Sequence, residues 1–391
     1  MSLTSRLFEY LYFIVLSIIV FLGYVIVPQY KIQSFVLMGI SISMLLLFRI
    51  KKIKNYEKML PLLLIFILSV LSLSYTISVN KSLDYIYILV SMLSLEIFLD
   101  NCEKKDSAIP TKVFYVFSFV HVIMTIIYLF VPNFIQSINQ KILSNKGYMY
   151  NINLHKYGCY AGICSDHGAN AIFISIFLAI AVEKILRKMS IKNCIMVVLG
   201  IIALFLTGKR GHLIACTIAF VISFVYYNKN NKQLIKKMFV FIFLAVILII
   251  ILNTIPATTF VFERFTILSD NGNVLNGRED IYNTLLQNIN KNPILGSGIN
   301  TTTIINKGND GHNIYLQIFS ELGVGGCLLL IYLIINNLVF FFKNKNNKKI
   351  SSLFFQVFFI ILGVTGNPLY YIPTLVVYNV FTSKYYIESE E

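Results

Sequence analysis

Two short segments of this sequence place cations at the starts of predicted helices. The segment LTGKRGH, residues 206–212, holds Lys209 and Arg210 in a tight turn between two apolar stretches. Neighbouring cations in such a turn favour anion binding, although a pair of snorkelling charges at a hairpin tip explains them equally well. The segment NGRED, residues 276–280, opens a predicted helix with Arg278, where the helix dipole does not favour a cation. Arg278 is therefore either paired with a nearby acid or reserved for an anionic ligand.

A third segment, DGHNIYLQIFSELGVGG at residues 310–326, places His312 at the start of a long apolar helix. Asn313, Gln317 and Glu321 follow at intervals of four residues, which puts their side chains on one face of that helix. A carboxylate near the centre of a bilayer costs about 2.5–3.5 kcal/mol, so Glu321 is expected to face a wet cavity or a partner. A lone histidine at a helix start is more often structural than catalytic, but the polar stripe beneath His312 favours a functional role.

Together these residue types suit the chemistry of a diphosphate. Arginine side chains grip a diphosphate through bidentate, charge-assisted hydrogen bonds and stabilise it as a leaving group. Histidine has a pKa suited to accepting a proton from an attacking hydroxyl at neutral pH. The sequence has no Asp-x-Asp pair, no histidine cluster and no cysteine framework for a metal. We therefore expect no metal or cofactor, and the arginines would supply the electrostatic role of a divalent ion.

The elements that must position these residues are membrane helices. The chain has 391 residues and is 57% hydrophobic and only 13% charged, with a mean hydropathy of +0.74, which excludes a soluble domain. Its apolar runs have about the length that crosses a bilayer as a helix, and lipid leaves the backbone no other partner than its own segment. We expect about twelve such helices, at residues 7–27, 32–49, 59–77, 83–99, 113–131, 168–186, 191–207, 211–227, 237–255, 313–342, 351–366 and 369–385.

Three of these segments raise questions of their own. Residues 313–342 would span about 45 Å as a continuous helix, so this helix must tilt or project outward. The segments 351–366 and 369–385 could form one re-entrant element, because Gly366, Asn367 and Pro368 separate them by a turn or a break.

The net charge of +15 is distributed as in a membrane protein and does not indicate a nucleic-acid partner. Under the positive-inside rule this charge distribution places both chain ends in the cytoplasm. The basic clusters need no partner other than anionic lipid headgroups. The first apolar stretch is expected to be retained as a helix, because no small-residue cleavage site follows it. The densest clusters lie at 49–58, 104–112, 184–192, 229–237 and 343–349.

The expected organisation is a block of nine transmembrane helices over 1–255, an extracytoplasmic loop over 256–312, and C-terminal transmembrane helices over 313–391. A second outer loop occupies 132–167. Within the longer loop, an apolar stripe of Ile281, Leu285 and Ile289 predicts an amphipathic helix that lies over the outer mouth of the bundle. Asn276 can cap this helix, and Asn292-Pro293 ends it.

The ordered set of motifs resembles the O-antigen polymerase and ligase superfamily of bacterial envelope glycosyltransferases, and among them the Wzy-type polysaccharide polymerases most. The resemblance rests on LTGKRG at a helix–helix turn, on GREDIYNTLLQNINKNPILGSGIN, and on HNIYLQIFSELGVGG. It covers residues 200–330, and the first half matches only in helix count and polarity.

This resemblance implies an all-α, polytopic, GT-C-like enzyme of the bacterial cytoplasmic membrane that acts without a metal on the periplasmic or extracellular face. It would polymerise polyprenyl-diphosphate-linked repeat units into O-antigen or capsular polysaccharide. Arg210 and Arg278 would bind the diphosphate of the donor, and His312 would activate the acceptor hydroxyl. Further implied contacts are Lys209 and Arg264 to phosphate, Asn313, Gln317 and Glu321 around the histidine, and Asp166 and His167, in CSDHGANA, to the acceptor or as a second choice of base.

The implied partners are the lipid-linked glycan donor and acceptor, membrane lipids, and a chain-length regulator protein as a further candidate. An O-antigen ligase, which transfers finished glycan to lipid A core, fits the same motifs. A flippase or transporter of lipid-linked oligosaccharide is the alternative from another class. It agrees with the helix number, but transporters usually bury ionisable residues at the midplane, and the predicted spans hold few here: Glu96 and His121 stand out, with Glu321 nearer the outer half.

Overall fold

The computed structural model describes residues 3–22, 30–47, 56–102, 108–229, 278–343 and 349–387. All regular secondary structure in these ranges is helical, and six helices are long and apolar enough to cross a membrane. Several shorter apolar helices accompany them. The prediction of an all-helical membrane protein is therefore confirmed for these ranges, and a helix occupies every predicted segment except 237–255, which lies outside the described residues together with Arg264.

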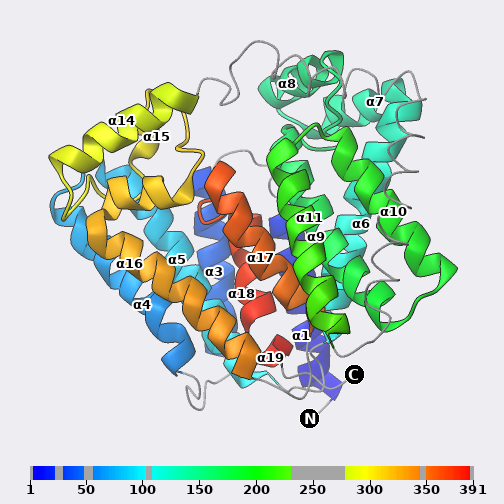
Figure 1. Ribbon diagram of the computed structural model, residues 1–391, viewed down its shortest axis with the longest axis horizontal. Helices are drawn as coiled ribbons and strands as arrows, with labels where there is room; N and C mark the ends of the chain where they lie inside the picture. The colour runs from blue at the N-terminus through cyan, green and yellow to red at the C-terminus, as the bar shows by residue number, and fades with distance from the viewer. Residues whose placement is uncertain are drawn as a thin grey trace. The chain divides into compact units, whose positions relative to one another are not determined.

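The chain forms two compact units, which are Met1–Val113 with Gly277–Glu391, and Phe114–Asn276. In the first unit α5 is central, because it packs against α3, α4, α18 and α19 (Figure 1). The helices of this unit are α1 (Leu3–Ser17), η1 (Ile18–Leu22), α3 (Tyr30–Leu47), α4 (Tyr56–Leu71), η2 (Ser72–Ser74), α5 (Val79–Asn101), α14 (Arg278–Lys291), α15 (Thr302–Ile305), α16 (Ile314–Lys343), α17 (Ile350–Thr365), α18 (Ile372–Thr382) and α19 (Lys384–Ile387).

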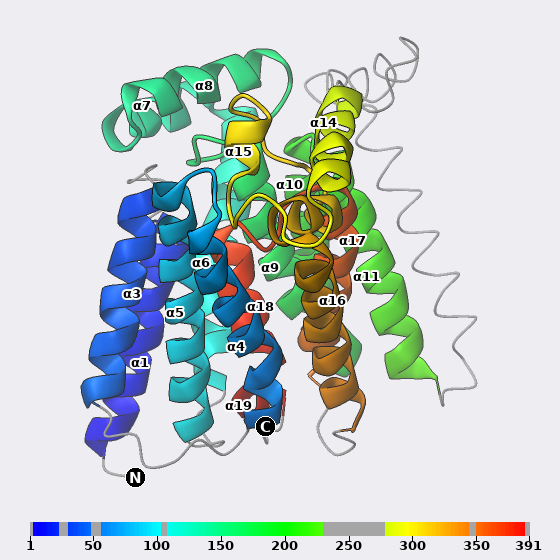
Figure 2. The same ribbon diagram turned by 90° about the vertical axis from the view of Figure 1, so that its left-hand side faces the viewer.

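The helix α16 differs from the prediction of one long, tilted or projecting helix. Its 30 residues are interrupted at Gly323, which adopts φ 64° and ψ −162°, so that the two parts run in different directions (Figure 1 and Figure 2). This left-handed conformation is readily available only to glycine. The second part, 324–343, would span about 30 Å, which matches the thickness of a bilayer core. The break thus resolves the excess length.

A turn from the preceding loop supplies the hydrogen bonds that the break in α16 leaves open. The N–H of Val324 donates to the carbonyl of Pro293 at 2.9 Å. The N–H groups of Ser297 and Gly298 donate to the carbonyls of Ser320 and Glu321, at 3.1 and 2.8 Å. Buried backbone groups need such partners, so the segment NPILGSG and the break at Gly323 depend on each other structurally.

The helices α17 and α18 are separate and pack against each other, with the turn 366–371 between them. The break expected at Gly366–Pro368 is therefore present.

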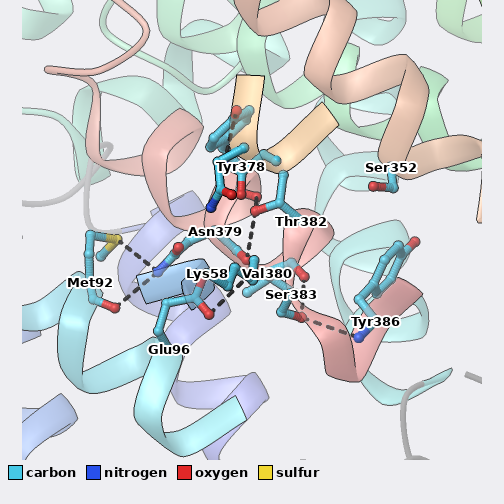
Figure 3. A network of polar contacts seen from close by, with 12 residues as sticks. Lys58, Met92, Glu96, Ser352, Tyr378, Asn379, Val380, Thr382, Ser383 and Tyr386 are labelled. Atoms are coloured by element: carbon cyan, nitrogen blue, oxygen red, sulfur yellow. Dashed lines mark hydrogen bonds and ion pairs between the residues drawn. The ribbon is translucent and has the colours of Figure 1, made fainter. Parts of the chain in front are cut away.

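A buried ion pair links two other helices of the same unit: the ammonium of Lys58 on α4 lies 2.9 Å from the carboxylate of Glu96 on α5 (Figure 3). Both side chains are buried. The Asn379 amide of α18 donates to the Met92 carbonyl of α5 at 3.0 Å nearby, so polar contacts tie three helices together.

The second unit is built around α9. Nearly all residues of this helix are buried, and it packs against α10 and α11. Gly200 of α10 allows this close packing, since a Cβ there would lie 2.6 Å from the Leu178 side chain. Two helices that the sequence did not predict, α7 and α8, lie within residues 132–167, which the sequence predicts to be an outer loop. The helices of this unit are α6 (Ala108–Phe130), whose first turns belong to the other unit, α7 (Pro132–Ile142), α8 (Asn145–Lys156), α9 (His167–Arg187), α10 (Ile191–Leu206) and α11 (Arg210–Asn228).

Candidate functional site

The predicted polar stripe of α16 is present and begins with a helix cap. The Asn313 side-chain oxygen accepts hydrogen bonds from the N–H groups of Tyr315 and Leu316, at 3.0 and 3.1 Å. These are donors that a helix start otherwise leaves without partners. One turn later, the Gln317 side chain accepts from the Gly311 N–H at 3.3 Å and donates to Glu321 at 3.2 Å. The stripe thus holds the main chain in place both before and after residue 312.

Glu321 faces partners, which is one of the two environments expected for it. Its carboxylate is fully buried and accepts from the N–H groups of Asn300 and Thr302, at 2.6 and 3.0 Å. The hydroxyl of Tyr370, in the turn before α18, donates to the same carboxylate. Glu321 therefore holds the 300–302 loop and the α17–α18 turn against α16, which makes it a positioning group.

His312 has a strained backbone that its surroundings hold in place. Its φ of 49° lies in the left-handed region, which costs a non-glycine residue on the order of 1–3 kcal/mol. Its carbonyl accepts a hydrogen bond from the Tyr282 hydroxyl of α14 at 3.3 Å. Strain that neighbouring contacts maintain is concentrated at functional sites in proteins.

Arg278 is the first residue of α14 and is half-buried. One of its guanidinium nitrogens, Nη1, donates to the carbonyl of Thr365 at the end of α17, at 3.1 Å. Within the described ranges it forms no ion pair with an acid, and the neighbouring Glu279 and Asp280 are exposed. Because residues four apart share a helix face, Arg278 and Tyr282 project from one side of α14. That side therefore meets both Thr365 and His312.

The second unit brings another group of predicted residues together at the start of α9. The Asp166 carboxylate caps this helix by accepting from the Ala169 N–H at 3.0 Å. A Cβ on Gly168 would lie 2.7 Å from Asp166 Oδ2 and 3.3 Å from Lys209 Nζ, so only glycine leaves room for both groups. His167 is buried as the first residue of α9.

The pKa of Asp166 reflects this environment. Burial by itself raises the pKa of the carboxyl, but the Lys209 and His167 charges and the N–H groups of Ala169 and Gly168 bring it below the ordinary 3.8. A carboxylate stabilised in this way is a weak proton acceptor. His312 is therefore the better candidate for a base.

The turn that carries Lys209 and Arg210 is shaped by its neighbours. Gly208 has φ 67°, and a Cβ there would lie 2.9 Å from the Cys159 sulphur. The Lys209 N–H donates to the Thr207 hydroxyl at 3.3 Å, and Arg210 begins α11. Neither Cys159 nor Cys164 forms a disulfide.

The structure thus assembles the predicted residues in two groups. The first unit holds Arg278, His312, Asn313, Gln317 and Glu321, and the second holds Asp166, His167, Lys209 and Arg210. The meeting of Arg210 with Arg278 and His312 stays a prediction.

Sequence reasoning assigned no part to three residues that border these groups. Tyr282 and Tyr370 contact His312 and Glu321, and His212 lies within electrostatic range of Asp166 and Lys209. The sequence does not indicate that the hydroxyls of these two tyrosines form polar contacts, because tyrosine is equally common as an apolar packing residue. His212 had one, since it directly follows Lys209-Arg210-Gly211.

Comparison with known proteins bears on the same part of the chain. Residues 195–331 match a family model described as O-antigen ligase. The matched segment contains Lys209 and Arg210, the α14 helix, and the α16 stripe. No curated protein matches the chain. The match over residues 195–331 therefore confirms the resemblance of this segment to the O-antigen polymerase and ligase superfamily.

Proposed function

We propose that this protein is a glycosyltransferase that polymerises polyprenyl-diphosphate-linked repeat units into O-antigen or capsular polysaccharide. The reaction would occur at the outer face of the bacterial cytoplasmic membrane. The family match supports O-antigen-related glycan processing by a membrane enzyme. One observation carries the mechanism: a single face of α14 holds Arg278 and, through Tyr282, the strained His312.

In the proposed reaction the acceptor hydroxyl oxygen attacks the anomeric carbon of the donor sugar. The new bond is carbon–oxygen, and the bond between that carbon and the diphosphate oxygen breaks. The bonding electrons leave with the polyprenyl diphosphate, and the His312 imidazole takes the proton of the hydroxyl. Arg278 neutralises the charge that develops on the departing diphosphate.

The contacts of Arg278 leave capacity for this task. Guanidinium has five N–H donors in a planar fork, and the bond to Thr365 employs one nitrogen. The remaining donors suit the oxygens of a diphosphate, with which arginine forms bidentate pairs. In the proposal Arg210 contacts the same diphosphate, Lys209 and Arg264 add charge, and Asp166 and His167 contribute to acceptor binding.

The test is polymerisation by purified protein in nanodiscs, supplied with a synthetic lipid-linked repeat unit and analysed as a ladder on a gel. Arg210→Ala, Arg278→Ala and His312→Ala should each abolish long products while the proteins remain folded. Arg187→Ala is a matched control, since this arginine pairs with Glu183 at the far end of α9 and should keep the wild-type ladder. Normal ladders from all three site variants would reject the mechanism. Arg278→Lys should also be nearly inactive, because lysine keeps the charge but not the bidentate geometry.

Transfer to lipid A core is the second candidate, because the matched family model is described as O-antigen ligase. The same donor chemistry serves both reactions, and only the acceptor differs. Supplying lipid-linked repeats and core oligosaccharide in separate reactions distinguishes them. Extension of the lipid-linked repeat supports polymerisation, and glycan on the core supports ligation.

A further inference from the structure

The second part of α16 carries a continuous apolar stripe on its exposed side. These residues recur at intervals of three or four, as on one face of a helix. Single exposed apolar residues are ordinary on protein surfaces, but a helical stripe of this length is not. It extends over about 27 Å at 1.5 Å per residue, close to the thickness of a bilayer core. Its members are Val324, Leu328, Ile331, Ile335, Val339 and Phe342.

The opposite side of this helix is covered by protein. Gly326, Leu330, Leu333, Asn337 and Phe341 are buried there and also recur at helical spacing. The exposed stripe is therefore the lipid-facing side of a membrane-spanning helix, and it begins directly after the break at Gly323.

The neighbouring helix α4 carries exposed apolar side chains up to the same level. Leu68 of α4 lies against Gly325, with 3.6 Å between a leucine methyl and the Cβ position of the glycine. Leu71, one turn further on α4, is exposed. Exposed apolar side chains of two adjacent helices thus reach the same level.

The turn inserted into the break of α16 lies at this level and presents two large apolar side chains. Ile294 is 72% exposed and Leu295 is 55% exposed. Their position is set by main-chain contacts, since Val324 donates to the Pro293 carbonyl and the Ile294 carbonyl packs on Gly323. The same turn continues into Ser297 and Gly298, which bind the carbonyls of Ser320 and Glu321.

We propose that Ile294 and Leu295 form a membrane anchor that inserts into the lipid at the boundary where the α16 stripe begins. The occupant is the upper acyl-chain region of one leaflet, because the anchor continues the lipid-facing surface of α16. Through Ser297 and Gly298 the anchor fixes the polar stripe of α16 at the lipid–water interface. That level is where a lipid-linked diphosphate presents its headgroup, a consequence that rests on the proposed function.

The chain has no tryptophan, so a single introduced tryptophan reports on one position. The variants are Ile294→Trp and Leu295→Trp, with Ile335→Trp on the lower α16 stripe as a deep control. Ile304→Trp on α15, a residue that is 44% exposed, serves as the control expected to face water. Each protein is placed in nanodiscs of phosphatidylcholine whose acyl chains carry bromine either near the headgroup or near the methyl end, without any glycan substrate.

Ile294→Trp and Leu295→Trp should be quenched several-fold more by shallow than by deep bromine, and hardly by iodide in the buffer. Ile335→Trp should show the reverse depth preference, and Ile304→Trp should respond to iodide alone. Iodide quenching of the two anchor variants without an effect of bromine would overturn the proposal. Protection from both quenchers would also overturn it, because another protein surface, such as a second copy of the chain, would then cover the turn. Neither result depends on glycosyl transfer, so failure of the anchor and failure of the proposed function are separate outcomes.

Discussion

The Tyr282 hydroxyl lies 3.3 Å from the main-chain oxygen of His312 and donates a hydrogen bond to it. Arg278 stands one turn earlier on the same helix and binds the end of α17. A histidine and an arginine that are 34 positions apart in the sequence are therefore positioned by one surface helix. Motion of α14 would move both groups together.

Tyr282→Phe removes this hydroxyl and should lower kcat with little change in KM. A net hydrogen bond is worth about 0.5–1.5 kcal/mol, which corresponds to roughly a two- to tenfold fall in rate. Tyr315→Phe is the matched control, because that hydroxyl also donates to a main-chain carbonyl, of Ile360 at 3.0 Å, but does not contact His312. The kinetic measurement should include the pH profile of kcat, which a purely structural role would not alter. Equal losses in both variants would contradict a specific role for Tyr282.

Gly323→Ala should destabilise the protein severely. The added methyl group would overlap the Ile294 carbonyl, and the residue would have to keep a φ of 64°. We expect a loss of at least about 2–3 kcal/mol, measured as a lower thermal unfolding midpoint in detergent. Gly39→Ala is the control: nothing lies within 4 Å of its Cβ position on α3, so this change should be neutral or slightly stabilising. A wild-type midpoint for Gly323→Ala would refute the account of the break.

Lys58→Met should cost about 3–5 kcal/mol, because it leaves the Glu96 carboxylate buried without its cation. Glu96→Leu should cost a similar amount. The double variant Lys58→Met/Glu96→Leu should recover most of the loss, since an apolar pair of similar volume often replaces a buried ion pair at little cost. Thermal unfolding of all four proteins forms a double-mutant cycle. Additive losses would show that the two side chains do not depend on each other.

Asp166→Asn tests the charge of this carboxylate, because asparagine can still cap α9. The pKa of Asp166 is lowered in the folded protein, so the carboxylate contributes stability above its unfolded pKa near 3.8. That contribution disappears as the pH falls through the lower, folded pKa. The variant should therefore unfold at a lower temperature than the wild type at pH 7. The difference should shrink below about pH 4, the range of the unfolded pKa. A constant difference from pH 7 to the acid range would argue against the charge pairing with Lys209.

Hydropathy predicted the location of the helices well, because each apolar run must satisfy its backbone locally in lipid. The polar stripe of α16 followed in the same way from a spacing of four residues. The break at Gly323 could not be foreseen, since a glycine in an apolar helix equally indicates close helix packing, as Gly325 does beside Leu68. The left-handed His312 and its bond to Tyr282 depend on contacts between segments, which no local pattern records.

Three main-chain hydrogen bonds join the 293–298 turn to α16, and they have a mechanical consequence. The turn cannot swing away on its own, since doing so would expose buried amides and carbonyls to lipid. If the proposed function holds, any hinge that admits a bulky polymer must therefore lie elsewhere, and thinning or thickening of the surrounding bilayer would shift this corner of the protein as a rigid body.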